Sequence, residues 1–170
     1  MKRIFLIGYM GSGKTTIGQL VADRIGYSFI DMDAHIEEKQ SKDITKIFVE
    51  IGEPGFRILE QQSLHEVAER ENVIISTGGG TPCFFDNMEY MNAHGLTIYL
   101  RFTAAELVER FTAKNPNKRP LLKNKIGPNL LQFITDGLIE REPFYSQAAY
   151  TIEGNIESTV IGICELVLGK

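Results

Sequence analysis

The apolar residues of the chain fall into two kinds of stretch: short continuous runs, and longer segments in which they recur every three or four positions. Short runs are typical of strands buried on both faces, and the longer segments are typical of helices with one buried face. The runs predict five strands, at about 2–7, 28–31, 73–76, 97–101 and 149–152. Because strands that alternate with helices form a covered parallel sheet, we expect an α/β fold, a three-layer sandwich around a five-stranded parallel sheet.

The first apolar run leads into GYMGSGKT at 8–15, and a helical pattern follows over 16–25. This stretch fits the pattern G-x-x-x-x-G-K-[ST] of a phosphate-binding P-loop, in the order of strand, loop and helix that the pattern requires. Glycines there let backbone N–H groups surround phosphate oxygens at the positive end of a helix. A chance loop would match in under about 1% of chains this long, so we predict a nucleotide site and a P-loop NTPase fold.

Residues of this loop have separate predicted tasks. Lys14 supplies a positive charge for the β and γ phosphates, and the Thr15 hydroxyl is placed to bind Mg²⁺. Thr16 either touches a phosphate or packs in the first helical turn. The predicted phosphate contacts are Gly11, Ser12, Gly13, Lys14, Thr15 and Thr16.

Length and charge limit the class of protein. The 170 residues suffice for one core, and we expect a single domain over 1–170. A net charge of -4 argues against nucleic acid or an anionic membrane as a partner. No apolar run approaches the ~18 residues that cross a bilayer, and the chain starts without a signal-peptide pattern. We therefore expect a cytoplasmic monomer.

The usual metal-binding side chains are dispersed along the sequence. Cys83 and Cys164 lie far apart, as do His35, His65 and His94. Neither set has the spacing of a zinc site, and two distant cysteines do not indicate a disulfide framework. We expect the histidines to be helix residues, and no metal other than nucleotide-bound Mg²⁺.

Two carboxylates follow the second predicted strand, at the sheet edge where ligands collect in such folds. An extended backbone would project Asp31 and Asp33 to the same side. Mg²⁺ would then take Asp31, leaving Asp33 as the hydrogen-bond acceptor or general base for an acceptor hydroxyl. The alternative is that one carboxylate caps the helix beginning near Ala34, and the two roles are compatible.

Three consecutive glycines, Gly78, Gly79 and Gly80, follow the third predicted strand. They lose much conformational entropy on folding, so close approach of the backbone to a ligand explains them better than an ordinary turn. We therefore place them at the same ligand site.

Arg57 lies at the entrance of a helical pattern, after a glycine and proline interruption. A positive charge at a helix start is unfavourable for the helix dipole, which indicates an anionic partner nearby. By spacing alone, an ion pair with Glu53 or Glu60 is an equal alternative.

The segment at about 112–125 is polar, basic and contains two prolines. It is predicted to be a lid that brings Arg119 onto a transferring phosphate, or else a solvated loop. Farther along, Arg141 lies near the end of a helical pattern, where it either binds an anion or stabilises the helix dipole.

Six segments together resemble the shikimate kinase family, and they cover nearly the whole chain. They are GYMGSGKT, Asp31-Met32-Asp33, the segment ending at Arg57, Gly78-Gly79-Gly80, Arg119-Pro120-Leu121-Leu122 and Arg141-Glu142-Pro143-Phe144-Tyr145. The resemblance implies ATP-dependent phosphorylation of the 3-hydroxyl of shikimate, in the route to chorismate and aromatic amino acids.

The resemblance also implies roles for single residues. Shikimate would contact Asp33, Arg57, Gly78, Gly79, Gly80 and Arg141. Thr15 and Asp31 would serve Mg²⁺, and Lys14, Asp33 and Arg119 would act in catalysis. Arg110 and Arg119 would contact ATP, with Arg110 stacked on adenine.

Two other functions fit parts of the sequence. Another small-molecule kinase, for gluconate or a nucleotide, would share the scaffold, but two arginines favour an acceptor with a carboxylate over a nucleoside. A GTPase switch would need an N-K-x-D element, and Asn124-Lys125-Ile126-Gly127 lacks the aspartate.

Overall fold

A computed structural model describes residues 2–113 and 128–169 and contains one parallel sheet with the strand order β2-β3-β1-β4-β5. The strands are β1 (Arg3–Ile7), β2 (Ser28–Asp31), β3 (Val73–Ser76), β4 (Leu96–Leu100) and β5 (Tyr150–Ile152). Every predicted strand is present, with ends within one residue of those expected. The α/β fold with a five-stranded parallel sheet is therefore confirmed.

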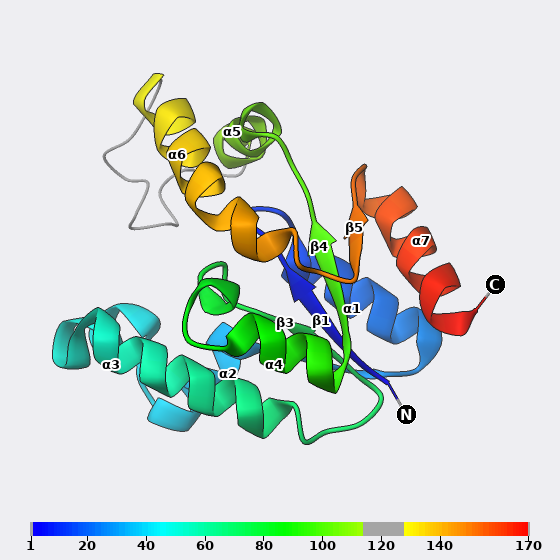
Figure 1. Ribbon diagram of the computed structural model, residues 1–170, viewed down its shortest axis with the longest axis horizontal. Helices are drawn as coiled ribbons and strands as arrows, with labels where there is room; N and C mark the ends of the chain where they lie inside the picture. The colour runs from blue at the N-terminus through cyan, green and yellow to red at the C-terminus, as the bar shows by residue number, and fades with distance from the viewer. Residues whose placement is uncertain (1, 114–127, 170) are drawn as a thin grey trace.

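Helices cover both faces of this sheet (Figure 1). They are α1 (Lys14–Ile25), α2 (Met32–Gln40), α3 (Ile44–Val67), α4 (Asn87–His94), α5 (Ala104–Ala113), α6 (Pro128–Tyr145) and α7 (Ile156–Leu168), with a short 3-10 helix η1 at Thr81–Cys83. Helices α1 and α7 pack together on one face, while α2 packs against α3 and α5 against α6. Among the described residues, no helix has the length and apolar character needed to span a membrane.

The core is built on the central strand β1, whose residues 4–7 are completely buried. This strand pairs with β3 on one side and with β4 on the other, and helices cover both faces of the sheet. That explains why its sequence is continuously apolar instead of alternating. A second, smaller cluster of Ile36, Ile47 and Phe56 joins α2 to α3.

Helix α3 contains the interruption predicted before Arg57. Gly52 has φ 67° and ψ 178°, a conformation that only glycine adopts at low cost, and the helix resumes after it through Pro54. The resumed segment directs Arg57 and Glu60 toward the loop that follows β3. Most of the predicted lid, including Arg119, lies outside the described residues.

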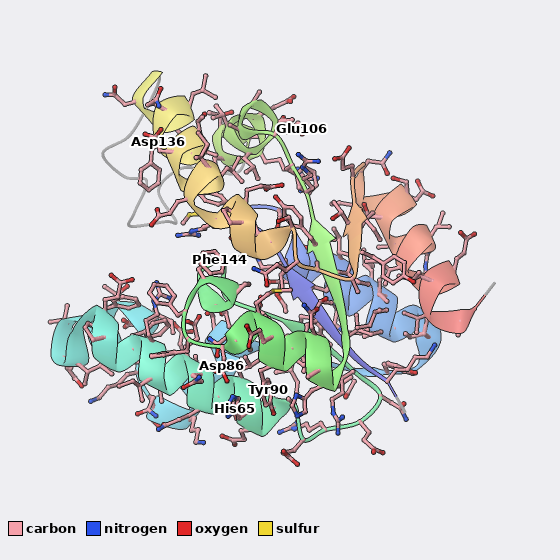
Figure 2. The ribbon with its side chains drawn as sticks, in the orientation of Figure 1. His65, Asp86, Tyr90, Glu106, Asp136 and Phe144 are labelled. Carbon is pink, nitrogen blue, oxygen red and sulfur yellow. The ribbon has the colours of Figure 1, made fainter. Side chains whose placement is uncertain are left out.

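The histidines lie on helices α2, α3 and α4. His65 of α3 stacks on Tyr90 of α4, with ring centroids 4.0 Å apart. Figure 2 labels these two residues. His94 stacks on the same Tyr90 ring at 3.9 Å. His65 therefore contributes to packing between α3 and α4, whereas the stack of His94 on Tyr90 lies within α4.

Substitutions of two glycines, one in α1 and one in α7, can test how α1 packs on the sheet. A Cβ atom added to Gly18 of α1 would lie 2.5 Å from the Phe29 ring of β2, whereas one added to Gly162 of α7 would meet nothing within 4 Å. We expect Gly18→Ala to destabilise the protein by about 1–3 kcal/mol through overpacking. Gly162→Ala should instead stabilise it by about 0.5–1 kcal/mol through helix propensity.

Urea unfolding of the two variants measures both effects. Equal stability changes of the same sign would contradict the described contact between α1 and β2.

Candidate active site

The glycine-rich loop connects β1 to α1 at the carboxyl edge of the sheet. Gly8 has φ 142°, and a Cβ atom there would lie 2.7 Å from the Leu100 carbonyl oxygen, so the loop requires glycine at this position. Gly13 precedes α1 with φ 92°, and it provides no side-chain cap for the first helical turn. The Lys14 ammonium donates hydrogen bonds to the carbonyl oxygens of Gly8 at 2.8 Å and Tyr9 at 3.2 Å.

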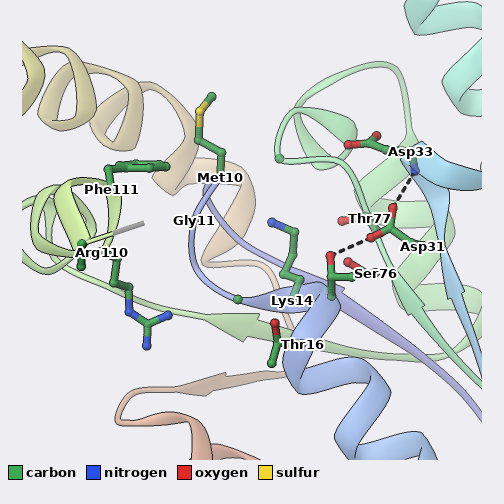
Figure 3. Close-up of a pocket in the computed structure, with 14 residues that line it drawn as sticks. Met10, Gly11, Lys14, Thr16, Asp31, Asp33, Ser76, Thr77, Arg110 and Phe111 are labelled. Atoms are coloured by element: carbon green, nitrogen blue, oxygen red, sulfur yellow. Dashed lines mark hydrogen bonds between the residues drawn. The ribbon is translucent and has the colours of Figure 1, made fainter. Parts of the chain in front are cut away.

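A cavity of about 750 Å³ opens beside this loop (Figure 3). It is bounded by the loop and α1, by the carboxyl ends of β2 and β3, and by the end of α5. Its lining residues are Met10, Gly11, Gly13, Lys14, Thr15, Thr16, Asp31, Asp33, Ser76, Thr77, Gly79, Arg110, Phe111 and Ala113. Most of the predicted nucleotide residues are therefore brought together with both predicted carboxylates.

Ser12 differs from its neighbours, because its side chain is completely buried and does not line the cavity. The Arg110 guanidinium donates a hydrogen bond to the Ser12 carbonyl oxygen at 3.3 Å and lies 4.0 Å from the centre of the Phe102 ring. Arg110 is thus fixed against the phosphate-binding loop. The Arg110 guanidinium therefore already contacts an aromatic ring of the protein, that of Phe102.

Asp31 links the loop to helix α2. One carboxylate oxygen accepts a hydrogen bond from the Thr15 hydroxyl at 2.6 Å. The other accepts from the backbone N–H groups of Asp33 at 3.1 Å and Ala34 at 3.2 Å (Figure 3). Asp31 is therefore the N-cap of α2, and the alternative in which Asp33 caps this helix is wrong.

Asp33 lies in the first turn of α2 instead of on an extended segment, so the geometric argument that placed it beside Asp31 was wrong. It nevertheless lines the same cavity. The residue is exposed to water. Desolvation, followed by the negative charges of Asp31 and Glu60, raises its pKa to about 6, against the opposing effect of Lys14.

Arg57 makes both of the ion pairs that its spacing allowed. Its guanidinium lies 2.8 Å from Glu53 and 3.1 Å from Glu60, and it stacks on the Phe84 ring at 4.0 Å. Glu60 is only 1% exposed and also accepts a hydrogen bond from the Thr81 hydroxyl at 2.6 Å. The buried charge of Glu60 is thus compensated on two sides.

The three glycines after β3 lie between the two arginines. A Cβ atom on Gly80 would lie 2.8 Å from Arg57, and one on Gly79 would lie 3.3 Å from Arg141. A Cβ atom on Gly78 would lie 2.6 Å from Glu60 and 3.3 Å from Asp33. Protein atoms therefore approach all three glycines closely, and the approach of a ligand to them stays a prediction.

Three side chains near these glycines were not singled out from the sequence. Glu60 appeared there only as an alternative partner of Arg57. Tyr9 lies under Arg141, with the guanidinium 5.0 Å from its ring centre. Burial raises the pKa of the Cys83 thiol to about 11, although Arg141 and Arg57 lower it, so this cysteine is a neutral neighbour of both arginines.

Similarity to known proteins identifies the family of this chain. The family model described as shikimate kinase matches residues 10–168. The chain belongs to the shikimate kinase family. It is 52% identical over 153 residues to the shikimate kinase of Parabacteroides distasonis, covering 90% of this chain and 88% of that protein. The family expected from the six segments is confirmed, and the chain is an ATP-dependent kinase with a P-loop fold.

Solved structures of shikimate kinases superpose closely on this chain. The enzyme from Bacteroides thetaiotaomicron gives a TM-score of 0.93 at 46% identity and covers 98% of both chains. A structure of the Acinetobacter baumannii enzyme in complex with shikimate gives 0.87 at 35% identity, covering 99% of this chain and 94% of that one. A gluconokinase from Sinorhizobium meliloti, at 17% identity and a TM-score of 0.58, shares the fold alone.

The raised pKa of Asp33 can be measured directly. In protein labelled with carbon-13 aspartate, we expect the Asp33 carboxyl to titrate at about pH 6 when no ligand is bound. Asp31→Asn should lower this pKa, because it removes a neighbouring negative charge while an asparagine still caps α2.

Glu37→Gln is the control, because Glu37 has the smallest of the recorded effects on Asp33. An Asp33 pKa that is unchanged in the Asp31 variant, or that shifts equally in both variants, would contradict the described arrangement.

Proposed function

We propose that this chain transfers the γ-phosphoryl group of ATP to the 3-hydroxyl of shikimate. The main supporting observation is the position of Gly79. A Cβ atom on this residue would lie 3.3 Å from the Met10 backbone nitrogen in the phosphate-binding loop and 3.3 Å from the Arg141 guanidinium. A phosphate site and a site for an anionic acceptor therefore share a wall, as direct transfer between two bound substrates requires.

ATP would be held by the loop and the start of α1. The backbone N–H groups of the loop and the Lys14 ammonium would bind the β and γ phosphates. Arg110, at the cavity wall, would contact the adenine side of the nucleotide. Arg119, which lies outside the described residues, is assigned by family resemblance to the transferred phosphoryl group.

The hydroxyl of Thr15 and the carboxylate of Asp31 fit a Mg²⁺ ion. They are two adjacent oxygens, one neutral and one anionic, at the edge of the phosphate cavity. Mg²⁺ is typically bound by few protein oxygens, with water and phosphate completing its shell. When bound, the ion would neutralise charge on the phosphates.

Shikimate would lie against Gly78, Gly79 and Gly80. Arg57 and Arg141 would bind its carboxylate, since both guanidinium groups approach this segment. Asp33 would accept a hydrogen bond from the reacting hydroxyl. A pKa of about 6 leaves this carboxylate ionised at neutral pH yet basic enough to assist removal of the proton.

This reaction needs only small-molecule substrates and one copy of the chain. The described residues assigned to it gather around the loops that follow β1, β2 and β3. We therefore propose a cytoplasmic monomer that consists of one kinase domain over 1–170, with a lid at about 112–125.

The acceptor can be tested by coupled ADP release. With ATP and Mg²⁺, we expect shikimate to be phosphorylated at least about a hundredfold faster than gluconate or nucleoside monophosphates, because only shikimate is expected to place its anionic group at Arg57 and Arg141 and its reacting hydroxyl at Asp33 at the same time. Phosphorus NMR of the product should show the 3-phosphate. Quinate serves as the control for a related ring with a carboxylate. Faster turnover of gluconate or of a nucleotide would overturn the proposal.

The role of Asp33 can be tested separately. Asp33→Asn should lower kcat by about a hundredfold or more, because the amide cannot accept the proton of the reacting hydroxyl. Its KM for ATP should change by less than about threefold, since Asp33 is not assigned to the nucleotide. Glu37→Gln, one turn farther along α2, should keep normal turnover. Near-normal turnover of the Asp33 variant would leave this residue without a role in the chemistry.

A further inference from the structure

Tyr145 is a buried polar residue that the proposed reaction does not yet use. It is the last residue of α6, its side chain is completely buried, and it lies one helical turn after Arg141. Its hydroxyl donates a hydrogen bond to the carbonyl oxygen of Gly79 at 2.5 Å. These two residues are 66 positions apart in the sequence, so this bond ties α6 to the loop after β3.

The same hydroxyl also interacts with the Arg141 guanidinium. Residues four apart on a helix share a face, which accounts for this contact. On its other side, Arg141 lies over the ring of Tyr9. Burial raises the pKa of the Tyr145 phenol despite the opposing charge of Arg141, so the hydroxyl stays protonated and remains a donor at neutral pH.

We propose that Tyr145 is a positioning residue for the acceptor substrate, because its hydroxyl fixes the Gly79 backbone and the Arg141 guanidinium relative to each other. This inference rests on the proposed function, in which both groups contact shikimate. Gly79 also approaches the Met10 nitrogen of the phosphate-binding loop. One hydroxyl therefore sets the distance between the acceptor and the phosphates, where small displacements lower the rate strongly.

Tyr99 provides a matched control. Its ring is also buried, with its centre 5.0 Å from that of Tyr145. Its hydroxyl, however, donates to Glu142 at 2.9 Å and lines a separate cavity of about 470 Å³. Replacing either tyrosine with phenylalanine removes one hydrogen-bonded hydroxyl from the same aromatic pair. The proposal assigns a role in shikimate binding to Tyr145 alone.

The experiment compares steady-state kinetics of Tyr145→Phe and Tyr99→Phe. We expect Tyr145→Phe to raise the KM for shikimate about tenfold, equivalent to about 1.4 kcal/mol, while the KM for ATP stays within about twofold. Tyr99→Phe should leave both constants within about twofold. Thermal unfolding should show losses of stability of similar size in the two variants, because each loses a hydroxyl that donates one partly buried hydrogen bond.

A shikimate KM that rises equally in both variants, or in neither, would overturn the proposal, since that is what a purely structural hydroxyl predicts. 4-Aminophenylalanine at position 145 keeps a donor on the ring and should hold the shikimate KM within about threefold of wild type. If Tyr145→Phe does not fold, the 4-aminophenylalanine variant alone decides. A tenfold rise of its KM for shikimate, despite the retained donor, would refute the inference.

Arg141→Lys separates this inference from the proposed function. It should raise the shikimate KM strongly, because lysine cannot bind a carboxylate through two parallel hydrogen bonds. An unchanged KM would reject the assignment of Arg141 itself. If Arg141→Lys impairs shikimate use while Tyr145→Phe does not, the proposed function stands and only the role of Tyr145 is lost.

Discussion

The pairing of β1 with β3 is the interaction on which the rest of the site depends. The two strands run side by side in register up to Leu6 and Ser76. Beyond them, the backbone N–H and the hydroxyl of Thr77 both donate to the Leu6 carbonyl oxygen, at 3.2 Å and 3.1 Å. The ladder therefore continues past the strand end. It brings the loop after β3 to the phosphate-binding loop after β1.

Charged side chains also gather where the loop after β3 meets the phosphate-binding loop after β1. Lys14 and Asp33 line the cavity from α1 and α2, while Arg57 and Glu60 approach the glycines from α3. Glu60 is compensated by the Arg57 guanidinium and the Thr81 hydroxyl, and Lys14 donates to two carbonyl oxygens. This arrangement keeps the cost of desolvation within what a folded domain tolerates. It also leaves Asp33 with a raised pKa, because desolvation and the negative charges of Asp31 and Glu60 together outweigh the opposing charge of Lys14.

The sequence predicted the features that depend on local pattern. Apolar runs located all five strands, the spacing at 8–15 located the phosphate-binding loop, and Gly52 was recognised as an interruption before Arg57. Features that depend on contacts between residues far apart in the sequence could not be predicted in the same way. Asp31 and Asp33 are two residues apart, yet only the fold decides which of them caps α2. The choice between an ion pair and a ligand for Arg57 likewise depends on burial, which spacing does not show.

The bonding of Lys14 has a consequence for how a nucleotide would enter. Its side chain is only 8% exposed, and its ammonium is already held by two carbonyl oxygens of its own loop. The flexibility of a long side chain and most of its hydration are therefore given up during folding, before any ligand arrives. An incoming phosphate meets a cation that is already ordered, so little of the attraction between them is spent on immobilising it.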